Sequence, residues 1–322
     1  MNHIKPKSKL RTILKWVGWF FLVQFVLINI SAALYAYKLT HFYHNGETTL
    51  NPSSNFLAKT WKLFTGPKFY KTPASQKPSL PFQTIQLTTA NGSNFECWYI
   101  PKDSAKGTVI LFHGLSNSKS ILLAEANGFY ELGYQTLLVD FRGHGNSSGN
   151  TTCYGAVETE EVKLAYDFIH SREEKNIILY GLSMGAVVVA KAFADYSIQP
   201  SKIILEAPFE NLRCHLRGRA RMLGFPAEPF ATLVCFWIGV ERDFNGFKLN
   251  TAAYAKKITC PVLLQYGTED KYVTRKETDN IFNAIASEKK KLALHENIGH
   301  ELFIHRNPDE WKNEVENFLE SR

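Results

Sequence analysis

Acidic residues are absent from the first 46 positions of this 322-residue chain, although six basic residues lie there. Subtracting these six from the formal net charge of +7 leaves +1 for everything from Glu47 onward. The basic excess therefore belongs to the N-terminal tail, and a basic patch for nucleic acid on the rest of the chain is not indicated. The six residues are Lys5, Lys7, Lys9, Arg11, Lys15 and Lys38.

Cysteine is also scarce, with five residues at positions 97, 153, 214, 235 and 260 and no C-x-x-C pair. This spacing argues against a metal site built from cysteines and against a disulfide framework. An odd number leaves at least one cysteine without a partner inside the chain. Internal repeats and low-complexity tracts are missing too, and 45% hydrophobic with 21% charged residues is an ordinary globular composition. No metal or organic cofactor is indicated.

A long apolar run from Trp16 to Tyr37 follows the basic tail of residues 1–15. Its length suits a membrane-spanning helix, which needs roughly 20 mostly apolar residues, and aromatic residues lie near both of its ends. The alternative is a cleaved signal peptide with Ser31-Ala32-Ala33 as its cleavage site, but the run is longer than a usual signal core. The positive-inside rule then predicts a cytoplasmic N-terminus, a single-pass anchor and an extracytoplasmic (periplasmic or lumenal) domain.

Residues 38–82 carry five prolines among polar residues, which predicts a juxtamembrane stalk. Within it, Phe56, Leu57, Trp61 and Phe64 recur at helical spacing, with Lys59 and Lys62 between them. This pattern fits a short helix on the membrane surface, or equally a helix packed on the domain.

Strands and helices alternate from Gln83 to the C-terminus, which predicts one domain over residues 83–322. Two antiparallel strands joined at Asn91-Gly92 come first, and short apolar strands separated by helical segments follow. We therefore expect a mostly parallel α/β sheet with helices on both faces. The expected later strands are Thr108–Phe112, Thr136–Asp140, Ile177–Tyr180, Ile203–Leu205, Val262–Tyr266 and Leu292–His295.

One interval breaks this alternation, because more than fifty residues separate the strand ending at Leu205 from the strand beginning at Val262. The interval contains arginines followed by many aromatic and aliphatic residues. We interpret residues 207–257 as a cap over the strand ends, and an elaborated packing helix is the alternative. The arginines are Arg213, Arg217, Arg219 and Arg221.

The pattern G-x-S-x-G occurs twice, around Ser183 and around Ser147. Ser183 follows an apolar strand and precedes a small-residue helix, as the serine of a nucleophile elbow does. Ser147 has loop on both sides. The context therefore favours Ser183 as a nucleophile.

A serine nucleophile needs a base and a group that orients the base. His300 follows the last expected strand, and Asp270 follows the strand before it. Because the carboxyl ends of parallel strands share one edge, we expect Ser183, Asp270 and His300 to converge there. Alternatively, Asp270 caps the next helix and His300 is a surface residue. Glu269 and then Glu206 are the alternative acids.

Two backbone N–H groups are needed for an oxyanion. Met184, directly after the serine, and Leu115, in the loop after the Thr108–Phe112 strand, are the candidates. His113 and Gly114 are expected to shape that loop. Arg142 and His144 are expected to brace the neighbouring loop, in which Asp140 would be a buried structural acid.

Together these motifs resemble the α/β-hydrolase superfamily, most of all its serine-aminopeptidase-like branch, which includes monoglyceride lipases and membrane-anchored depalmitoylases. The resemblance implies Ser183 as nucleophile, His300 as base, Asp270 as orienting acid, Leu115 and Met184 as oxyanion donors, and a cap where the long interval lies. Proline iminopeptidases of this superfamily carry H-G-G-P-G where this chain has His113-Gly-Leu-Ser-Asn117, which weakens a peptidase reading. The motifs are H-G-L-S, D-F-R-G-H-G-N-S-S-G, G-L-S-M-G, G-T-E-D and G-H.

The function expected from the sequence is a membrane-anchored serine hydrolase that acts on carboxylic esters or thioesters of an apolar or acyl substrate. The alternatives are an amide or peptide hydrolase with the same three residues and a non-catalytic binding protein of the same fold. Expected partners are a small-molecule substrate and the membrane, not nucleic acid. The oligomeric state is not indicated.

Overall fold

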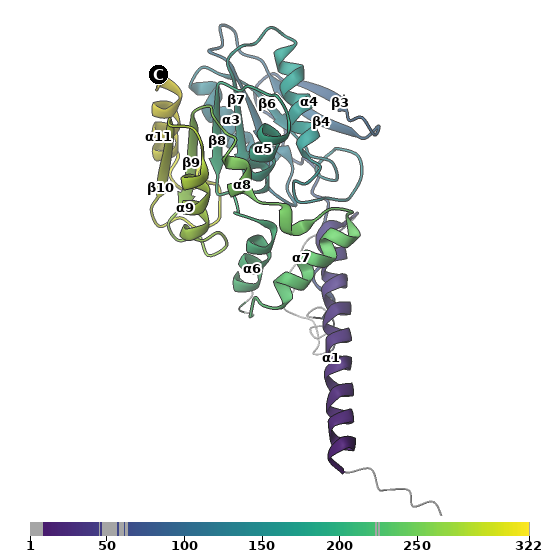
Figure 1. The fold of residues 1–322 in the computed structure, drawn as a ribbon. Helices are drawn as coiled ribbons and strands as arrows, with labels where there is room; N and C mark the ends of the chain where they lie inside the picture. Colours follow the sequence, from purple (N-terminus) through teal and green to yellow (C-terminus); the bar gives the residue numbers. More distant parts are fainter. Residues whose placement is uncertain are drawn as a thin grey trace, which may run out of the picture.

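An eight-stranded sheet forms the centre of the molecule (Figure 1). The computed structural model describes residues 9–44, 46, 57, 61, 64–222, 224 and 226–321. The strand order is β10-β9-β8-β7-β5-β6-β4-β3. The strands are β3 (Gln83–Thr88), β4 (Asn94–Ile100), β5 (Thr108–Phe112), β6 (Gln135–Val139), β7 (Ile177–Leu182), β8 (Lys202–Glu206), β9 (Val262–Gly267) and β10 (Lys290–His295).

Strands β5 to β10 run parallel, and only the first two strands of the sheet bring antiparallel pairings. Every residue of β5, β7 and β9 is buried, as expected for parallel strands covered on both faces. The edge strand β3 instead alternates between exposed and half-buried residues. The predicted α/β-hydrolase fold with a mostly parallel sheet is therefore confirmed.

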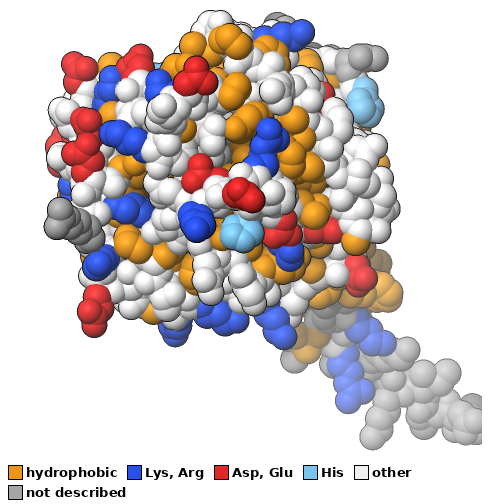
Figure 2. Space-filling view, turned by 90° about the horizontal axis from the view of Figure 1, so that it is seen from above, with side chains coloured by type: hydrophobic (Ala, Val, Ile, Leu, Met, Phe, Trp, Pro, Cys, Tyr) orange, Lys and Arg blue, Asp and Glu red, His pale blue; other side chains and the backbone are white. Residues whose placement is uncertain are grey.

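Helices cover both faces of this sheet (Figure 1). The apolar cluster on one face contains η1 (Lys119–Leu122), α3 (Leu123–Glu131), α10 (Phe303–Arg306) and α11 (Pro308–Glu320). The other contains α4 (Thr159–His170), α5 (Met184–Asp195), α8 (Thr251–Ala255) and α9 (Arg275–Ala284). The surface turned away from the cap and from α1 carries basic and acidic side chains interspersed with apolar ones (Figure 2).

The interval expected as a cap divides into two parts. Helices α6 (Leu212–Met222) and α7 (Phe230–Glu241), followed by η2 (Gly246–Lys248), project beyond the sheet on the side of α1 (Figure 1). Helix α8, at the end of the interval, instead packs against α5 and α9 and so belongs to the face of the sheet. Leu223 and Phe225, which the sequence also placed in this interval, lie outside the described residues.

The N-terminal helix α1 (Lys9–Thr40) is long and apolar enough to cross a membrane. It extends beyond the expected span of 16–37, and its last turns pack against α7 (Figure 1). Ala32 and Ala36 are fully buried there. Trp237 Nε1 donates to Asn29 Oδ1 at 3.3 Å, and Ser31 Oγ donates to the carbonyl of Phe64 at 2.5 Å. Residues 1–8, with Lys5 and Lys7, lie outside the described residues.

The described parts of the expected stalk lie against the domain. Strands β1 (Phe42–Tyr43) and β2 (Phe69–Tyr70) pair in parallel, and Phe42 is buried. Lys71 Nζ donates to the carbonyl of Gly149 at 2.9 Å, which ties the segment to the loop after β6. Leu57 and Trp61 of the expected short helix are exposed. Phe56, Lys59 and Lys62 lie outside the described residues.

Candidate active site

Ser183 occupies the turn between β7 and α5, because β7 ends at Leu182 and α5 begins at Met184. Its φ is 51° and its ψ is −111°, a backbone conformation that a residue with a side chain rarely adopts. Such strain persists only where the surroundings fix it, and it is concentrated at functional sites. The sharp turn lifts the serine hydroxyl out of the sheet edge.

Two glycines make this turn possible by their lack of a side chain. A Cβ atom at Gly181 would lie 2.6 Å from Cα of Ala186, and one at Gly185 would lie 2.2 Å from the carbonyl oxygen of Phe112. Both distances are shorter than atoms tolerate, so helix α5 can approach β5 and β7 this closely only with glycine at the two positions. The G-x-S-x-G pattern is thus a packing requirement of the turn.

A chain of hydrogen bonds joins the three residues that the sequence expected to converge. Ser183 Oγ lies 3.1 Å from His300 Nε2, and His300 Nδ1 lies 2.7 Å from Asp270 Oδ2. The carboxylate can only accept, so Nδ1 carries the proton and Nε2 is free to accept from the serine hydroxyl. The three residues follow β7, β9 and β10, whose carboxyl ends share one edge of the sheet.

The remaining oxygen of Asp270 is held by the backbone. Its Oδ1 accepts from the N–H groups of Tyr272 at 2.7 Å and Val273 at 2.8 Å, and its side chain is fully buried. The ring of Tyr272 stacks on the ring of His300 with centroids 4.9 Å apart. Both the carboxylate and the imidazole are therefore fixed in orientation, as a general base requires.

The alternative residues lie elsewhere. Glu269 is exposed, and its own N–H is bonded to the carbonyl of Ile298. Glu206 is buried at the end of β8, where its carboxylate accepts from the Tyr180 hydroxyl at 2.8 Å and from Trp311 Nε1 at 3.2 Å. Burial raises the pKa of Glu206 to about 7, even though these donors act in the opposite direction.

Ser147, the serine of the second G-x-S-x-G match, is buried. Its hydroxyl donates to the carbonyl of Asp140 at 2.8 Å and accepts from the N–H of Glu96 at 3.0 Å. The hydroxyl thus donates one hydrogen bond to the backbone and accepts another from it, so Ser147 braces the loop after β6.

The loop after β5 lies directly against Ser183. A Cβ atom at Gly114 would lie 3.5 Å from Cβ of Ser183, and Leu115 lines the same cavity as Ser183. Met184 is the first residue of α5, where the N–H groups have no acceptor within the helix. Of the two expected oxyanion donors, Met184 therefore directly follows the serine, and Leu115 lines the same cavity.

His113 holds this loop in place. Its Nδ1 donates to the carbonyl of Gly114 at 2.7 Å, and its Nε2 accepts from the N–H of Phe141 at 3.2 Å. Burial lowers the pKa of His113 to about 4, so the ring is neutral near pH 7. The sequence suggested that His113 shapes its own loop, and the bond from Phe141 also ties this loop to the one after β6.

Asp140 is buried, and its partner was missed by the sequence reasoning. Lys119 is fully buried and its ammonium lies between Asp140 and Glu96, at 2.9 Å from the latter. The N–H of Lys119 also donates to Asp140 Oδ1 at 2.6 Å. A single lysine in the polar run Ser-Asn-Ser-Lys-Ser gave no signal for this. Arg142, expected as a brace, pairs with Glu160 and Glu161 on α4.

A cavity of about 490 Å³ opens above Ser183 and His300, within the size range of ligand sites. Cap helix α6 contributes His215 and Arg219 to its lining, and neither was expected there. Burial lowers the pKa of His215 well below its ordinary value, and its ring is hydrogen-bonded to the Tyr272 hydroxyl at 2.9 Å. Within the described part of the chain, no group of three or more metal-binding side chains is arranged to hold a metal ion.

The five cysteines are free, and Cys97, Cys153 and Cys235 are buried. Burial raises the pKa of Cys153 to about 11, which keeps that thiol protonated and unreactive near pH 7. None of the five lines the cavity above Ser183.

Comparisons with known proteins agree with this architecture. The family model described as serine aminopeptidase, S33, matches residues 103–245 and 247–307. The Bacillus subtilis protein YqkD is 26% identical over 242 residues, which are 73% of this chain and 78% of YqkD. Lysophosphatidylserine lipase ABHD12 of Xenopus tropicalis is 24% identical over 243 residues, which are 68% of this chain and 59% of that relative. The chain thus covers less than two thirds of the lipase's length.

Solved structures share the fold. The Pyrococcus furiosus esterase Pf2001 aligns with a TM-score of 0.66 and 23% identity, over 78% of this chain and 96% of the esterase. The Exiguobacterium antarcticum esterase EaEST aligns with a TM-score of 0.57 and 16% identity, over 74% of this chain and all of that chain. From its family match and its architecture, this chain belongs to the serine aminopeptidase S33 family of α/β hydrolases.

Proposed function

We propose that this α/β hydrolase cleaves carboxylic esters or thioesters of an acyl substrate, with Ser183 as nucleophile, His300 as base and Asp270 as orienting acid. The observation that carries the proposal is the hydrogen-bonded chain of these three side chains, joined to the strained backbone of Ser183. The family match and the esterase and lipase names among the relatives support a hydrolase of esterase or lipase type.

In the first half of the reaction, Ser183 Oγ attacks the acyl carbonyl carbon while its proton passes to His300 Nε2. The N–H groups of Leu115 and Met184 stabilise the oxyanion that forms. The C–O or C–S bond to the leaving group then breaks, and His300 returns the proton to the departing oxygen or sulfur. In the second half, water attacks the acyl-enzyme with His300 again as base, which releases the acid and restores the Ser183 hydroxyl.

The lining of the cavity favours esters over the substrates of an aminopeptidase. An aminopeptidase has to bind a free ammonium group, which needs an available carboxylate. Glu301 is the one acid among the described lining residues, and its carboxylate pairs with Arg306 at 2.9 Å. Arg219 brings a positive charge to the same cavity, which repels an ammonium group.

A panel of acyl esters, acyl thioesters and aminoacyl amides, offered to the purified full chain in detergent, tests this proposal. We expect turnover of esters or thioesters and a loss of at least about a thousandfold in Ser183→Ala. Ser147→Ala is the matched control, because it removes the serine of the other G-x-S-x-G match. Full ester turnover in Ser183→Ala, or turnover of aminoacyl amides alone, would overturn the proposal.

The topology is a separate proposal: α1 anchors the protein with its N-terminus in the cytoplasm and the hydrolase domain outside it. The basic residues before the apolar run support this orientation. A cysteine introduced at the exposed Ser321 should react with a membrane-impermeant maleimide on intact cells, whereas the chain without it gives the background from the native cysteines. Labelling of Ser321→Cys only after the cells are opened would reverse the orientation.

A further inference from the structure

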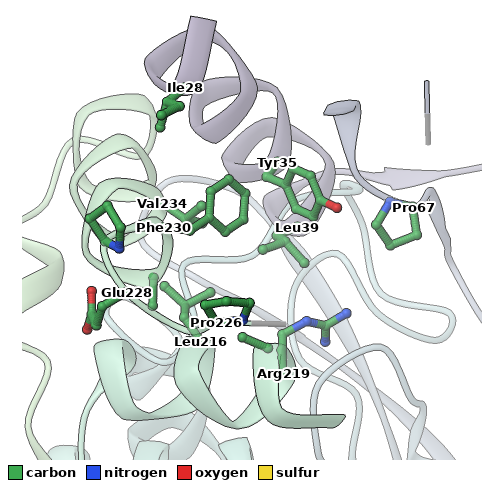
Figure 3. A pocket seen from close by; sticks show the side chains of 13 residues that line it. Ile28, Tyr35, Leu39, Pro67, Leu216, Arg219, Pro226, Glu228, Phe230 and Val234 are labelled. Carbon is green, nitrogen blue, oxygen red and sulfur yellow. The ribbon is translucent and has the colours of Figure 1, made fainter. Parts of the chain in front are cut away.

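A second cavity, of about 390 Å³, lies between α1 and the cap helices α6 and α7 (Figure 3). Its walls are mostly apolar: Tyr35 and Leu39 reach into it from α1, Leu216 from α6, and Phe230 and Val234 from α7 (Figure 3). The charged side chains of its lining are Arg219 and Glu228. The N-terminal helix is therefore a wall of this cavity and more than a tether. An apolar cavity of this size is suited to an alkyl chain.

The cavity begins where α1 leaves the domain. Ile28 lines its rim and is 41% exposed, and residues 11–27 of α1 are exposed as well. The exposed apolar stretch from Trp16 to Ile28 is about 20 Å long at 1.5 Å per residue, which is shorter than the roughly 30 Å of a bilayer's hydrocarbon core. The apolar side chains Phe236 and Val240 on the neighbouring α7 are exposed too. With α1 as the anchor, the rim of the cavity would thus lie within the apolar layer of the bilayer, where an acyl chain can reach it.

Arg219 connects this cavity to the catalytic one, because its side chain lines both. In Figure 3 the side chain of Arg219 extends from α6 along the cavity, and its guanidinium points away from Phe230 and Val234. The guanidinium lies 4.7 Å from the ring centre of Phe69 and is hydrogen-bonded to Tyr272, the residue that stacks on His300. The two cavities therefore meet at a positive charge beside the base.

The other arginines of α6 behave differently. Arg213 and Arg217 both pair with Glu228, and Arg221 pairs with Glu277. Arg219 has no carboxylate partner among the described residues, although it is half-buried and continues the helical spacing of the buried Leu212, His215 and Leu216. A charge at such a position without a counter-ion is costly unless an anion joins it.

We propose that the substrate of Ser183 is a membrane-derived acyl ester with an anionic group, whose acyl chain fills the cavity between α1, α6 and α7 and whose anion binds Arg219. The inference rests on the proposed hydrolase function and on α1 as a membrane anchor. The chain enters from the bilayer at Ile28 and passes along α1, so that the ester carbonyl reaches Ser183 in the adjoining cavity. Arg219 positions the anionic part of the leaving group and takes no part in bond making.

The acyl-chain part is tested by filling the cavity. Ala220 lines it from α6 but does not line the catalytic cavity, so Ala220→Phe occupies chain space without touching Ser183. We expect the ratio of lauroyl to acetyl 4-nitrophenyl ester turnover to fall about tenfold or more, since several buried methylene groups lose their place at about 0.8 kcal/mol each. Val234→Phe, from the opposite wall, should do the same if Ala220→Phe proves unstable. Met222→Phe is the matched control, because Met222 is an exposed residue of the same helix that lines neither cavity.

The anion part is tested with two substrates that differ only in a phosphate, 1-lauroylglycerol and 1-lauroylglycerol 3-phosphate, in micelles of a non-ionic detergent. Arg219→Gln should lower the ratio of kcat/KM for the phosphate-bearing ester to that for the neutral ester about tenfold or more, because charge-assisted hydrogen bonds are lost. Arg217→Gln, on the paired face of α6, should keep the wild-type ratio.

Three results would overturn the inference: no wild-type preference for the lauroyl ester, unchanged chain-length ratios in both Phe variants, or equal loss on both glycerol esters in Arg219→Gln. Each leaves the proposed hydrolase function standing as long as Ser183→Ala is inactive. Ester hydrolysis that survives in Ser183→Ala would instead overturn the proposed function itself.

Discussion

The edge of the sheet and the helical region formed by α1, α6 and α7 are built in opposite ways. At the sheet edge, a Cβ added at Gly181 or Gly185 would meet backbone atoms at less than 3 Å, and hydrogen bonds fix every reacting side chain. In the helical region, apolar side chains meet across a cavity, and one arginine has no carboxylate partner among the described residues. The sheet edge holds the reacting side chains rigidly. The side chains proposed to select the substrate lie instead on helices outside the sheet, which can vary without moving the reacting groups.

The largest effect should come from the orienting acid at the sheet edge. In Asp270→Asn, the amide presents an N–H where His300 needs an acceptor, which favours the wrong tautomer of the ring. We expect kcat to fall about 10³- to 10⁴-fold while the fold is kept. Steady-state ester kinetics and circular dichroism measure the two.

Glu269→Gln is the matched control for this change, because it alters the neighbouring exposed acid in the same loop. Its kcat should stay within about threefold of wild type, as for surface substitutions in general. A loss of similar size in both variants would mean that the loop as a whole, and not the hydrogen bond from His300 Nδ1, is what matters.

A smaller effect, on the stability of the fold, should distinguish the tightly packed sheet edge from the exposed part of α1. In Gly185→Ala the new Cβ would lie 2.2 Å from the carbonyl oxygen of Phe112, so α5 must move from β5. Overpacking of this kind costs about 3 kcal/mol. Gly18→Ala makes the same chemical change in α1, where nothing lies within 4 Å of the added Cβ.

Thermal unfolding of the full chain in detergent measures both glycine variants. Gly185→Ala should have a clearly lower melting temperature than wild type and lose ester activity. Gly18→Ala should have the melting temperature of wild type. Equal melting temperatures for all three proteins would show that the sheet edge is not as tightly packed as described.

A third prediction concerns the buried brace of the oxyanion loop. The pKa of His113 is lowered by burial to about 4, from an unfolded value near 6.5. A histidine with a depressed folded pKa stabilises the protein above its unfolded pKa, and this contribution is lost as the pH falls from about 6.5 toward 4. Between pH 7 and pH 5 the loss should be about 2 kcal/mol.

Urea unfolding at pH 7, 6 and 5 measures this loss, and His113→Gln is the comparison. Gln does not titrate, so its stability should fall less over the same range, with His144 and His215 still contributing in both proteins. Burial lowers the pKa of His144 to about 3, and the pKa of His215 is also lowered by burial. Parallel pH profiles for wild type and His113→Gln would contradict a neutral, buried His113.

The site at the sheet edge was predictable because each of its residues lies in a recognisable local pattern of the sequence. Gly181, Ser183 and Gly185 lie within one turn, and Asp270 and His300 each follow an apolar strand, so the parallel topology brings them together. The position of each residue after a strand was therefore enough to predict that the three residues meet in space. The distinction between Ser183 and Ser147 also came from the flanking strand and helix.

The helical region was less predictable because its contacts are long-range. The run from Trp16 to Tyr37 is apolar on all sides, so no stripe indicated that its end would pack on α7. Arg219 did leave a signal: it continues the spacing Leu212, His215, Leu216, in which i, i+3, i+4 and i+7 share one helix face. An arginine at that spacing places a half-buried charge on the packed face of the helix, which the bare list of four arginines did not distinguish.

The proposed chemistry depends on Ser183, and not the serine of the other G-x-S-x-G match, being the nucleophile. A fluorophosphonate reacted with the full chain, followed by tandem mass spectrometry, locates the covalent adduct directly. We expect an adduct on Ser183 that is lost in Ser183→Ala, retained in Ser147→Ala and strongly slowed in Asp270→Asn. An adduct on Ser147, or equal labelling of wild type and Ser183→Ala, would contradict it.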